Sequence, residues 1–350
     1  MISIPFLFQI LLSIFLPLWL YFWIGRTVKK YNTSCLDLKQ NIPSTYFLLK
    51  YWWAEYCINR MKKKERHLDY EKSHLENSKI KDKNSANSIF FYGADQKGNS
   101  LVIKFTRRAF KIAEISLQLV TSDGHLYVLP EYPDTTLTSS LTQEWTAGGL
   151  RIEFLNFQQR WRIIYNGMLR NLTQGDECND DNVEHVRFNF IFIANSRPLR
   201  WPEDWSSKLH AEALACEPWK NPDWINKIKL FEYTGFDQWG SMLGQITYKD
   251  GSVSSLYLRG LHQHRWGKHE SCEFYESVTL FGVMLYGAMY YLNMSSTRYS
   301  FPQIQFGQYR TNNESTAEIS KIGLKLSDFK QRKLNNNLEY KTWFIAENKK

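Results

Sequence analysis

HVRFNFIF, at residues 185–192, carries an apolar side chain at every second position. These positions are Val186, Phe188, Phe190 and Phe192. Successive side chains of a β-strand point to opposite faces, so all four would share one face of an extended segment. A period of two is typical of a strand with one face in a hydrophobic core. The stretch therefore predicts a β-rich domain.

Similar short runs lie on both sides of this stretch and are separated by turn residues. One separator, Ser-Asp-Gly at 122–124, is a hairpin signal. Many short strands with few helical interruptions indicate a mainly β protein, with an antiparallel barrel or sandwich rather than alternating strands and helices. The predicted strands include residues 89–92, 101–105, 112–120, 126–129, 150–154 and 161–165.

One helix interrupts the strand pattern at residues 205–219. Leu209, Ala213 and Cys216 fall at helical spacing, and prolines follow at 218 and 222. The helix suggests two β units, the second with few strands for a barrel of its own, so we expect a truncated form of a longer protein. The predicted segments are a first β unit at 88–204, a helical connection at 205–232, a second, incomplete β unit at 233–310 and a polar, irregular tail at 311–350.

Residues 2–24 contain no charged side chain. As a helix this segment would be roughly 35 Å long, enough to cross a hydrocarbon core of ~30 Å. Basic residues follow it at Arg26, Lys29 and Lys30, whereas a cleaved signal peptide carries them before the apolar run. We therefore predict a retained single-pass transmembrane anchor at 1–25.

The basic residues after the anchor place the body of the protein in the cytosol, because Lys and Arg are enriched on the cytoplasmic side of membrane spans. Four N-x-S/T sequons favour the opposite orientation, but such short matches are weak signals. The sequons begin at Asn32, Asn171, Asn293 and Asn313.

Residues 26–87 are expected to form a juxtamembrane amphipathic helix and a charged linker. The stretch TYFLLKYWWAEYCI at 45–58 is too short and too polar to span a bilayer. Its Tyr and Trp content suits a helix at the membrane interface, and packing against the body is an equal alternative. The basic cluster that begins at Arg60 either meets anionic lipid or is solvated.

Composition narrows the possible partners. The net charge is +9, yet the basic residues do not form one stripe, so nucleic acid is not an expected partner. The five cysteines are widely spaced without a C-x-x-C pair, which argues against a disulfide framework or a zinc cluster. The 16% aromatic content favours wide pleated surfaces and cavities lined by rings. Neither a metal nor a cofactor is expected.

LYLRGLHQHRWG, at residues 256–267, is the most informative stretch for function. In one uninterrupted strand, His262, His264 and Trp266 would share an apolar face, and a bulge at Gly260 would break that register. An apolar face with a few polar groups is how ligand cavities are built.

Three interpretations of the two histidines remain open. With His269 they could ligate a metal, although no carboxylate or cysteine supports them. One could act as a general acid or base. Both could be structural groups held by hydrogen bonds. No phosphate-binding P-loop and no G-x-S-x-G nucleophile motif occurs.

Several sequence blocks, spread over roughly residues 46–310, resemble the N-terminal region of animal proteins, common in arthropods and nematodes, that are named for phosphoenolpyruvate synthase. The blocks are FFYGADQKGNSLV, LYVLPEYPDT, TAGGLRIEF, RWRIIYNGMLR, HVRFNFIF, ACEPW, QWGSMLGQI and LYLRGLHQHRWGKHE. The resemblance implies an anchor followed by a β domain distantly similar to the lipocalin-like pair of barrels in carotenoid hydratases of the hydroxyneurosporene synthase type.

Two departures limit what the resemblance implies. The ATP-grasp and phosphohistidine regions behind the phosphoenolpyruvate synthase name do not occur in a chain that ends at Lys350, so phosphotransfer is not credited to it. Related proteins also carry a run similar to R-D-H-S-W-G-x-R-D, in which Gln263 replaces the first acidic position here. A mechanism that needs this carboxylate is therefore disfavoured, whereas a role in shaping the pocket is not.

The leading hypothesis is a membrane-tethered, lipocalin-like β domain that binds an apolar ligand, a lipid or an isoprenoid. The first alternative is a hydratase or isomerase of an apolar alkene in which His264 moves the proton. The second is a non-catalytic region of a larger phosphotransferase. The sequence does not indicate an oligomeric state. The expected ligand-binding residues are His262, His264, Trp266, Arg259 and Trp239.

Overall fold

The computed structural model describes residues 46–65, 85–132, 135–138, 145–156, 158–174, 182–201, 203–204, 206–216, 233–268, 276–284, 287–296, 301–311, 316–322 and 344–348. The predicted anchor at 1–25 lies outside these ranges. Of the helices within them, none combines the length and apolar character needed to cross a membrane.

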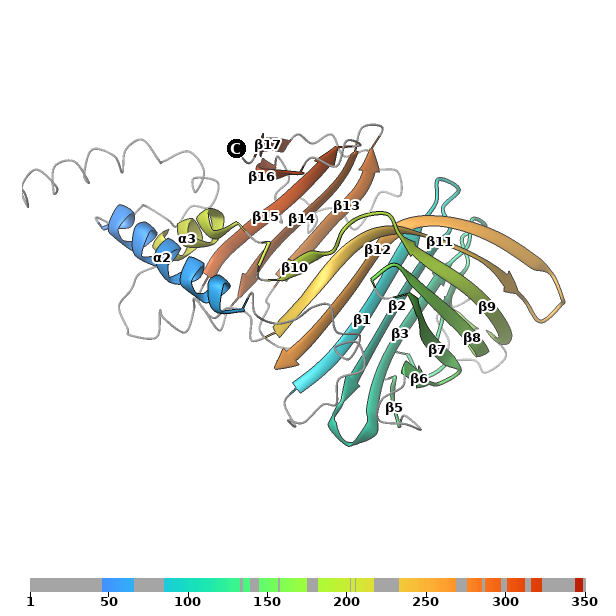
Figure 1. The fold of residues 1–350 in the computed structure, drawn as a ribbon. Helices are drawn as coiled ribbons and strands as arrows, with labels where there is room; N and C mark the ends of the chain where they lie inside the picture. Colours follow the sequence, from blue (N-terminus) through green and yellow to red (C-terminus); the bar gives the residue numbers. More distant parts are fainter. Residues whose placement is uncertain are drawn as a thin grey trace, which may run out of the picture.

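Eight antiparallel strands form a closed barrel (Figure 1). Around the ring, β1 pairs with β2, and the pairing continues through β3, β4, β8, β9, β11 and β12 back to β1. Neighbours in the ring follow one another in the chain, so the barrel is an up-and-down type with insertions. The strands are β1 Ser85–Ala94, β2 Ser100–Arg108, β3 Ile112–Val120, β4 Leu126–Val128, β8 Arg160–Asn171, β9 Val183–Ala194, β11 Tyr233–Thr247 and β12 Val253–Lys268.

Short elements decorate the barrel. β5 pairs with β3, β10 pairs with β11, and the β6–β7 hairpin extends the sheet from β8. Gly148 and Gly149 form the turn of that hairpin with φ of 55° and 81°; a two-residue turn with both φ values positive matches the twist of the flanking strands. The elements are β5 Thr136–Thr138, β6 Trp145–Ala147, β7 Leu150–Asn156, β10 Leu199–Trp201 and 3-10 turns at Ala109–Lys111 and Leu172–Gln174.

A second antiparallel sheet follows the barrel in the chain. We expected a second β unit to begin at residue 233, but β11 and β12 complete the barrel and the separate sheet begins at β13. The expected irregular tail also contains strands. The sheet comprises β13 Glu276–Met284, β14 Gly287–Ser296, β15 Phe301–Thr311, β16 Thr316–Ile322 and β17 Phe344–Asn348.

Two helices pack on each other beside the second sheet (Figure 1). α2 spans Phe47–Glu65, and α3 spans Ser207–Cys216 inside the segment predicted as helical. Phe47 and Leu48 of α2 pack against Ala215 of α3 in a small core of their own. One face of α2 is therefore buried against α3.

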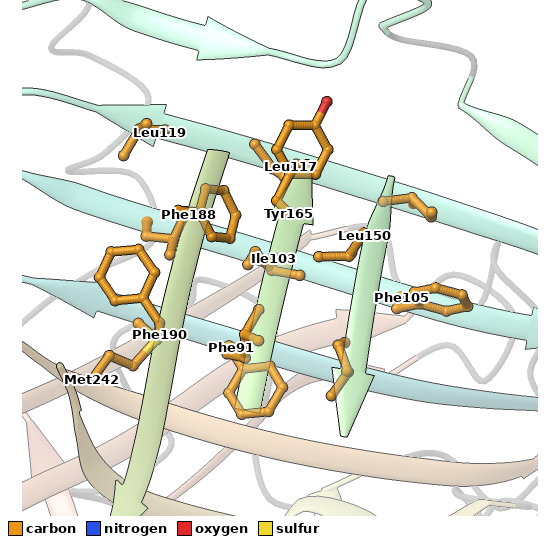
Figure 2. Close-up of a cluster of buried hydrophobic side chains, with 14 of the residues drawn as sticks. Phe91, Ile103, Phe105, Leu117, Leu119, Leu150, Tyr165, Phe188, Phe190 and Met242 are labelled. Atoms are coloured by element: carbon orange, nitrogen blue, oxygen red, sulfur yellow. The ribbon is translucent and has the colours of Figure 1, made fainter. Parts of the chain in front are cut away.

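The barrel interior is one continuous hydrophobic core, and its side chains come from every second position of each strand. Figure 2 shows side chains from facing strands meeting across it, including Phe91, Leu117 and Phe190. The period of two in residues 185–192 is confirmed, because Val186, Phe188, Phe190 and Phe192 are all buried.

Three glycines pair side by side on the neighbouring strands β1, β12 and β11 and form a row across the barrel wall. Gly260 of β12 pairs with Gly93 on one side and with Gly240 on the other, without a bulge. A Cβ atom added at Gly93 would lie 2.3 Å from Cε of Met242, and one at Gly240 would lie 2.3 Å from Cζ of Phe192. Larger side chains therefore occupy the space above the glycine row.

Candidate ligand-binding site

Five polar side chains lie on one side of the glycine row, point into the barrel and are almost fully buried. We call this set the polar layer; its members are Asn87, Arg107, Gln238, His262 and His264. Residues that pair across antiparallel strands point to the same face. Register places Gln238 opposite His262 and Arg107 opposite Asn87, on four adjacent strands. The layer is therefore built from two pairs of consecutive strands, β1–β2 and β11–β12, that are distant from each other in sequence.

His262 lies among aromatic rings at the centre of the layer. Its ring centroid is 4.2 Å from that of Trp161 and 4.6 Å from that of Phe91. Neither imidazole nitrogen has a hydrogen-bond partner among the described residues. Burying a polar group without a partner costs about 1–3 kcal/mol. This arrangement differs from the structural hypothesis, in which hydrogen bonds hold both histidines.

One of the two ring nitrogens of His264 has a hydrogen-bond partner. Its Nε2 lies 2.7 Å from Oδ1 of Asn87, and because an amide oxygen accepts, Nε2 donates. Nδ1 is then an unprotonated acceptor with no partner among the described residues. The alkene hydratase alternative required a carboxylate beside this histidine, and the observed partner is an amide.

Burial, together with the positive charges of Arg107 and Arg265, lowers the pKa of His264 to about 3. Burial, with His264 and Arg265 nearby, also holds the pKa of His262 well below its usual value. Both imidazoles are therefore neutral at neutral pH. A neutral imidazole this hard to protonate is a weak general base, but it remains a hydrogen-bonding group.

Arg107 brings a cation into the layer. Its guanidinium carbon lies 4.0 Å from the ring centroid of Trp145, and only 3% of the residue is exposed. Burial lowers the pKa of Arg107 to about 10, so the side chain stays protonated at neutral pH. A cation held over an aromatic ring in a poorly solvated site attracts negative charge more strongly than it would in water.

Gln238 of the layer and the neighbouring Trp161 of β8 add further polar atoms beside His262. Nε2 of Gln238 donates to the carbonyl oxygens of Gln158 (2.9 Å) and Ser196 (3.1 Å), which fixes the amide. Oε1 of Gln238 and Nε1–H of Trp161 have no partner among the described residues. The layer thus offers both a donor and an acceptor next to His262.

Of the five residues expected to bind the ligand, three face the interior and two do not. His262 and His264 are in the polar layer, and Trp266 packs against the same core. Trp239 and Arg259 have the opposite parity and lie on the outer face, where Trp239 pairs with Leu261 and Arg259 pairs with Ser241. Arg259 cannot contact a ligand inside the barrel, although its position in the sequence is close to that of the histidines.

Sequence reasoning missed four interior groups: Asn87, Arg107, Trp161 and Gln238. Arg107 continues the parity of Leu101, Ile103 and Phe105, so period two alone could have found it. Asn87 precedes the residue at which the first strand was expected to begin. His269, the third histidine of the metal hypothesis, lies outside the described residues, and the described ranges contain no cluster of three His, Cys, Asp or Glu side chains.

The sequence model of a family of unknown function, DUF8627, matches residues 16–350. No curated protein matches the chain. The solved structures include a distant neighbour, a provisionally assigned AttH protein from Nitrosomonas europaea. It is 10% identical, with a TM-score of 0.39, and the match covers 68% of this chain and 69% of that one. None of these findings concerns phosphoenolpyruvate synthase or carotenoid hydratase, so that resemblance stays a prediction.

Proposed function

Because the chain belongs to the DUF8627 family, whose function is unknown, we propose a function from the barrel itself: it binds an apolar small molecule that has an acidic head. The observation that carries this proposal is His262, a fully buried imidazole with neither nitrogen paired among the described residues. A ligand oxygen at this position would remove the cost of burying an unpaired polar group.

The polar layer supports an acidic head over a neutral one. Arg107 supplies a buried positive charge, and Nε1–H of Trp161 is available as a donor. Buried donors and a cation favour a carboxylate, because charge-assisted hydrogen bonds are about twice as strong as neutral ones. The hydrocarbon part of the ligand would lie against the rings around His262.

Entry of a ligand requires these rings to move. Phe91, Trp161 and Phe192 contact one another edge-on, Phe91 stacks on His262, and Trp161 and Phe192 are tilted against it, with centroid distances from 4.2 to 6.4 Å. Aromatic rings turn about two side-chain torsions, so a flat or thin chain can be inserted by rotation without a change in strand pairing. A flexible fatty acid or an isoprenoid acid meets this requirement.

A photoreactive fatty acid tests the proposal in the full chain. The protein is reconstituted in phosphatidylcholine vesicles that contain palmitic acid carrying a diazirine, irradiated, and mapped by peptide mass spectrometry. We expect adducts on inward side chains near His262 in β1, β8 and β12. Adducts confined to residues 2–24 or to outward side chains would contradict the proposal.

The methyl ester of the same probe is the matched control for the acidic head. It has the same chain and the same diazirine, but it lacks the charge that Arg107 would attract. We expect it to label the interior much less than the acid does. If the ester labels the interior as strongly as the acid, the barrel still binds an apolar ligand, but the proposal of an acidic head is wrong.

The uncharged segment at 2–24 supports a second part of the proposal, that the protein is tethered to a membrane with its body in the cytosol. Alkaline carbonate extraction of cell membranes tests the tether, because it releases peripheral proteins and leaves spanning ones. We expect the chain to stay in the pellet, and release into the supernatant would contradict the tether. Glycosidase treatment tests the orientation. We expect no mass shift, because sequons in the cytosol are not glycosylated, and a shift would contradict the cytosolic orientation.

A further inference from the structure

Helix α2 buries one apolar face and exposes a second group of large apolar side chains, which a helix on a soluble domain usually replaces with polar residues. Tyr46, at the start of the helix, and Leu49, Trp52, Trp53 and Tyr56 are 45–59% exposed. We call these five residues the aromatic face. The rings of Trp53 and Tyr56 stack at a centroid distance of 5.8 Å, so they form one continuous surface.

The opposite side of α2 is the one that packs on the body. Phe47, Ala54 and Ile58 are buried there, and so are Lys50 and Lys62. Leaving large rings such as those of Trp53 and Tyr56 more than half exposed to water is unfavourable for an isolated domain. The arrangement becomes favourable if the aromatic face contacts a medium that is neither water nor a tightly packed core.

The basic residues continue the same face. Trp53, Tyr56, Arg60 and Lys63 are spaced four, three, four and three residues from Leu49 onward and are all exposed, as residues on one side of an α-helix must be. Rings occupy the N-terminal turns and cations the C-terminal turns. The helix of 19 residues is about 28 Å long.

We infer that this face of α2 docks on the surface of a lipid bilayer that contains anionic headgroups. Tryptophan and tyrosine are enriched where hydrocarbon meets headgroups, because their rings are apolar and their N–H or O–H groups reach water. Arg60 and Lys63 complement the negative charge of the headgroups. The helix lies along the membrane plane and does not cross it.

Charge favours the bilayer over a second copy of this chain. The chain carries a net charge of +9, and Arg60 and Lys63 are exposed while Glu55 is only half-buried to one side, so two copies of these basic turns would repel each other. An anionic bilayer attracts both turns and accepts the rings without the shape matching that a protein partner requires. This inference is independent of what the barrel binds.

Site-specific photocrosslinking in the full chain tests the inference. The photoreactive residue p-benzoylphenylalanine replaces Trp53 or, separately, Tyr56, and the protein is reconstituted in phosphatidylcholine vesicles with phosphatidylserine. We expect a phospholipid adduct at both positions. The matched control is the same replacement at Phe110, which is 76% exposed in the 3-10 turn between β2 and β3 and should give no lipid adduct.

A charge-reversed variant separates docking from mere proximity to the anchor. Arg60→Glu with Lys63→Glu keeps residues 2–24 and the rings, yet we expect the lipid adduct at position 53 to fall at least roughly thirtyfold, since each of the two cations lost near an anionic surface contributes about 1 kcal/mol. A protein–protein adduct at position 53, an equal lipid adduct at position 110, or an unchanged adduct in the charge-reversed variant would overturn the inference.

Discussion

The two halves of the barrel, on either side of the glycine row, are filled by different kinds of side chain. On one side, Leu119, Phe190 and Met242 pack together in the hydrophobic core (Figure 2). On the other, the polar layer buries two imidazoles, two amides and a guanidinium among aromatic rings. Both halves are equally inaccessible to solvent, so burial does not distinguish them.

This difference indicates that one half of the barrel stabilises the fold and the other binds a ligand. Apolar packing stabilises a fold by removing surface from water. Buried polar atoms without partners, such as both ring nitrogens of His262, lower stability, so their presence in a fold is explained better by recognition than by structure. The apolar half therefore maintains the barrel, and the polar half is the part adapted to bind. Four predictions test or sharpen this contrast.

The largest effect is expected in the apolar half. Phe190→Ala removes a fully buried ring that packs edge-on against Phe188. Such truncations cost about 3–5 kcal/mol through lost transfer energy and the cavity left behind. Urea unfolding of the detergent-solubilised chain, followed by tryptophan fluorescence, measures the change. A loss below about 1 kcal/mol would show that this half is not the stabilising one.

The second effect is a pH dependence that comes from the polar half. The folded pKa of His264 is about 3, whereas the unfolded value is near 6.5, so the unfolded chain binds more protons between these pH values. Stability therefore falls as pH drops below 6.5. Between pH 7 and 5, His264 alone accounts for about 2 kcal/mol, and the lowered pKa of His262 acts in the same direction.

His264→Gln is the control for this pH dependence. Glutamine keeps an N–H that can donate to Asn87 but does not titrate. Unfolding free energies measured at pH 5, 6 and 7 should change less steeply in this variant than in the wild type. Parallel pH profiles would mean that the imidazole is not held neutral by the fold.

The third effect has the opposite sign from the first. His262→Leu replaces an unpaired buried imidazole with an apolar side chain of similar size. We expect the ligand-free protein to gain about 1–3 kcal/mol in unfolding free energy, as measured by the same urea titration. A loss as large as that of Phe190→Ala would show that His262 is a structural member of the core.

The smallest effect is expected on the outer face. Arg259 lies two residues before Leu261 and three before His262, but its side chain points outward and its guanidinium contacts the ring of Tyr257 at 6.0 Å. Arg259→Ala should change unfolding free energy by less than about 0.5 kcal/mol and leave interior labelling by the photoreactive acid unchanged. Lost labelling would place the ligand outside the barrel.

Strand positions could be predicted from the sequence because each barrel strand has one buried face, and local alternation records it. The face shared by His262 and His264 was predictable for the same reason. Ring closure was not, since the pairing of β1 with β12 joins segments about 170 residues apart and leaves no local signal. The assignment of residues 233–268 to a second unit failed for this reason.

The other members of the candidate site were harder to predict. Arg107 has the parity of a core residue, but its charge is typical of a strand end at the surface. Gln238 and Trp161 belong to the site only because the fold brings them next to His262. That contact depends on strand pairing, which the local sequence does not show. Arg259 and Trp239 were expected in the site because they are near the histidines in sequence or in motif, and strand parity places both outside.

Native mass spectrometry of the full chain, extracted gently from its membrane, tests the central claim most directly. The account predicts that the wild-type protein and Arg259→Ala each retain one apolar acid per chain, and that His262→Leu does not. Wild-type protein that carries no such molecule, or His262→Leu that retains it to the same extent, would contradict the account.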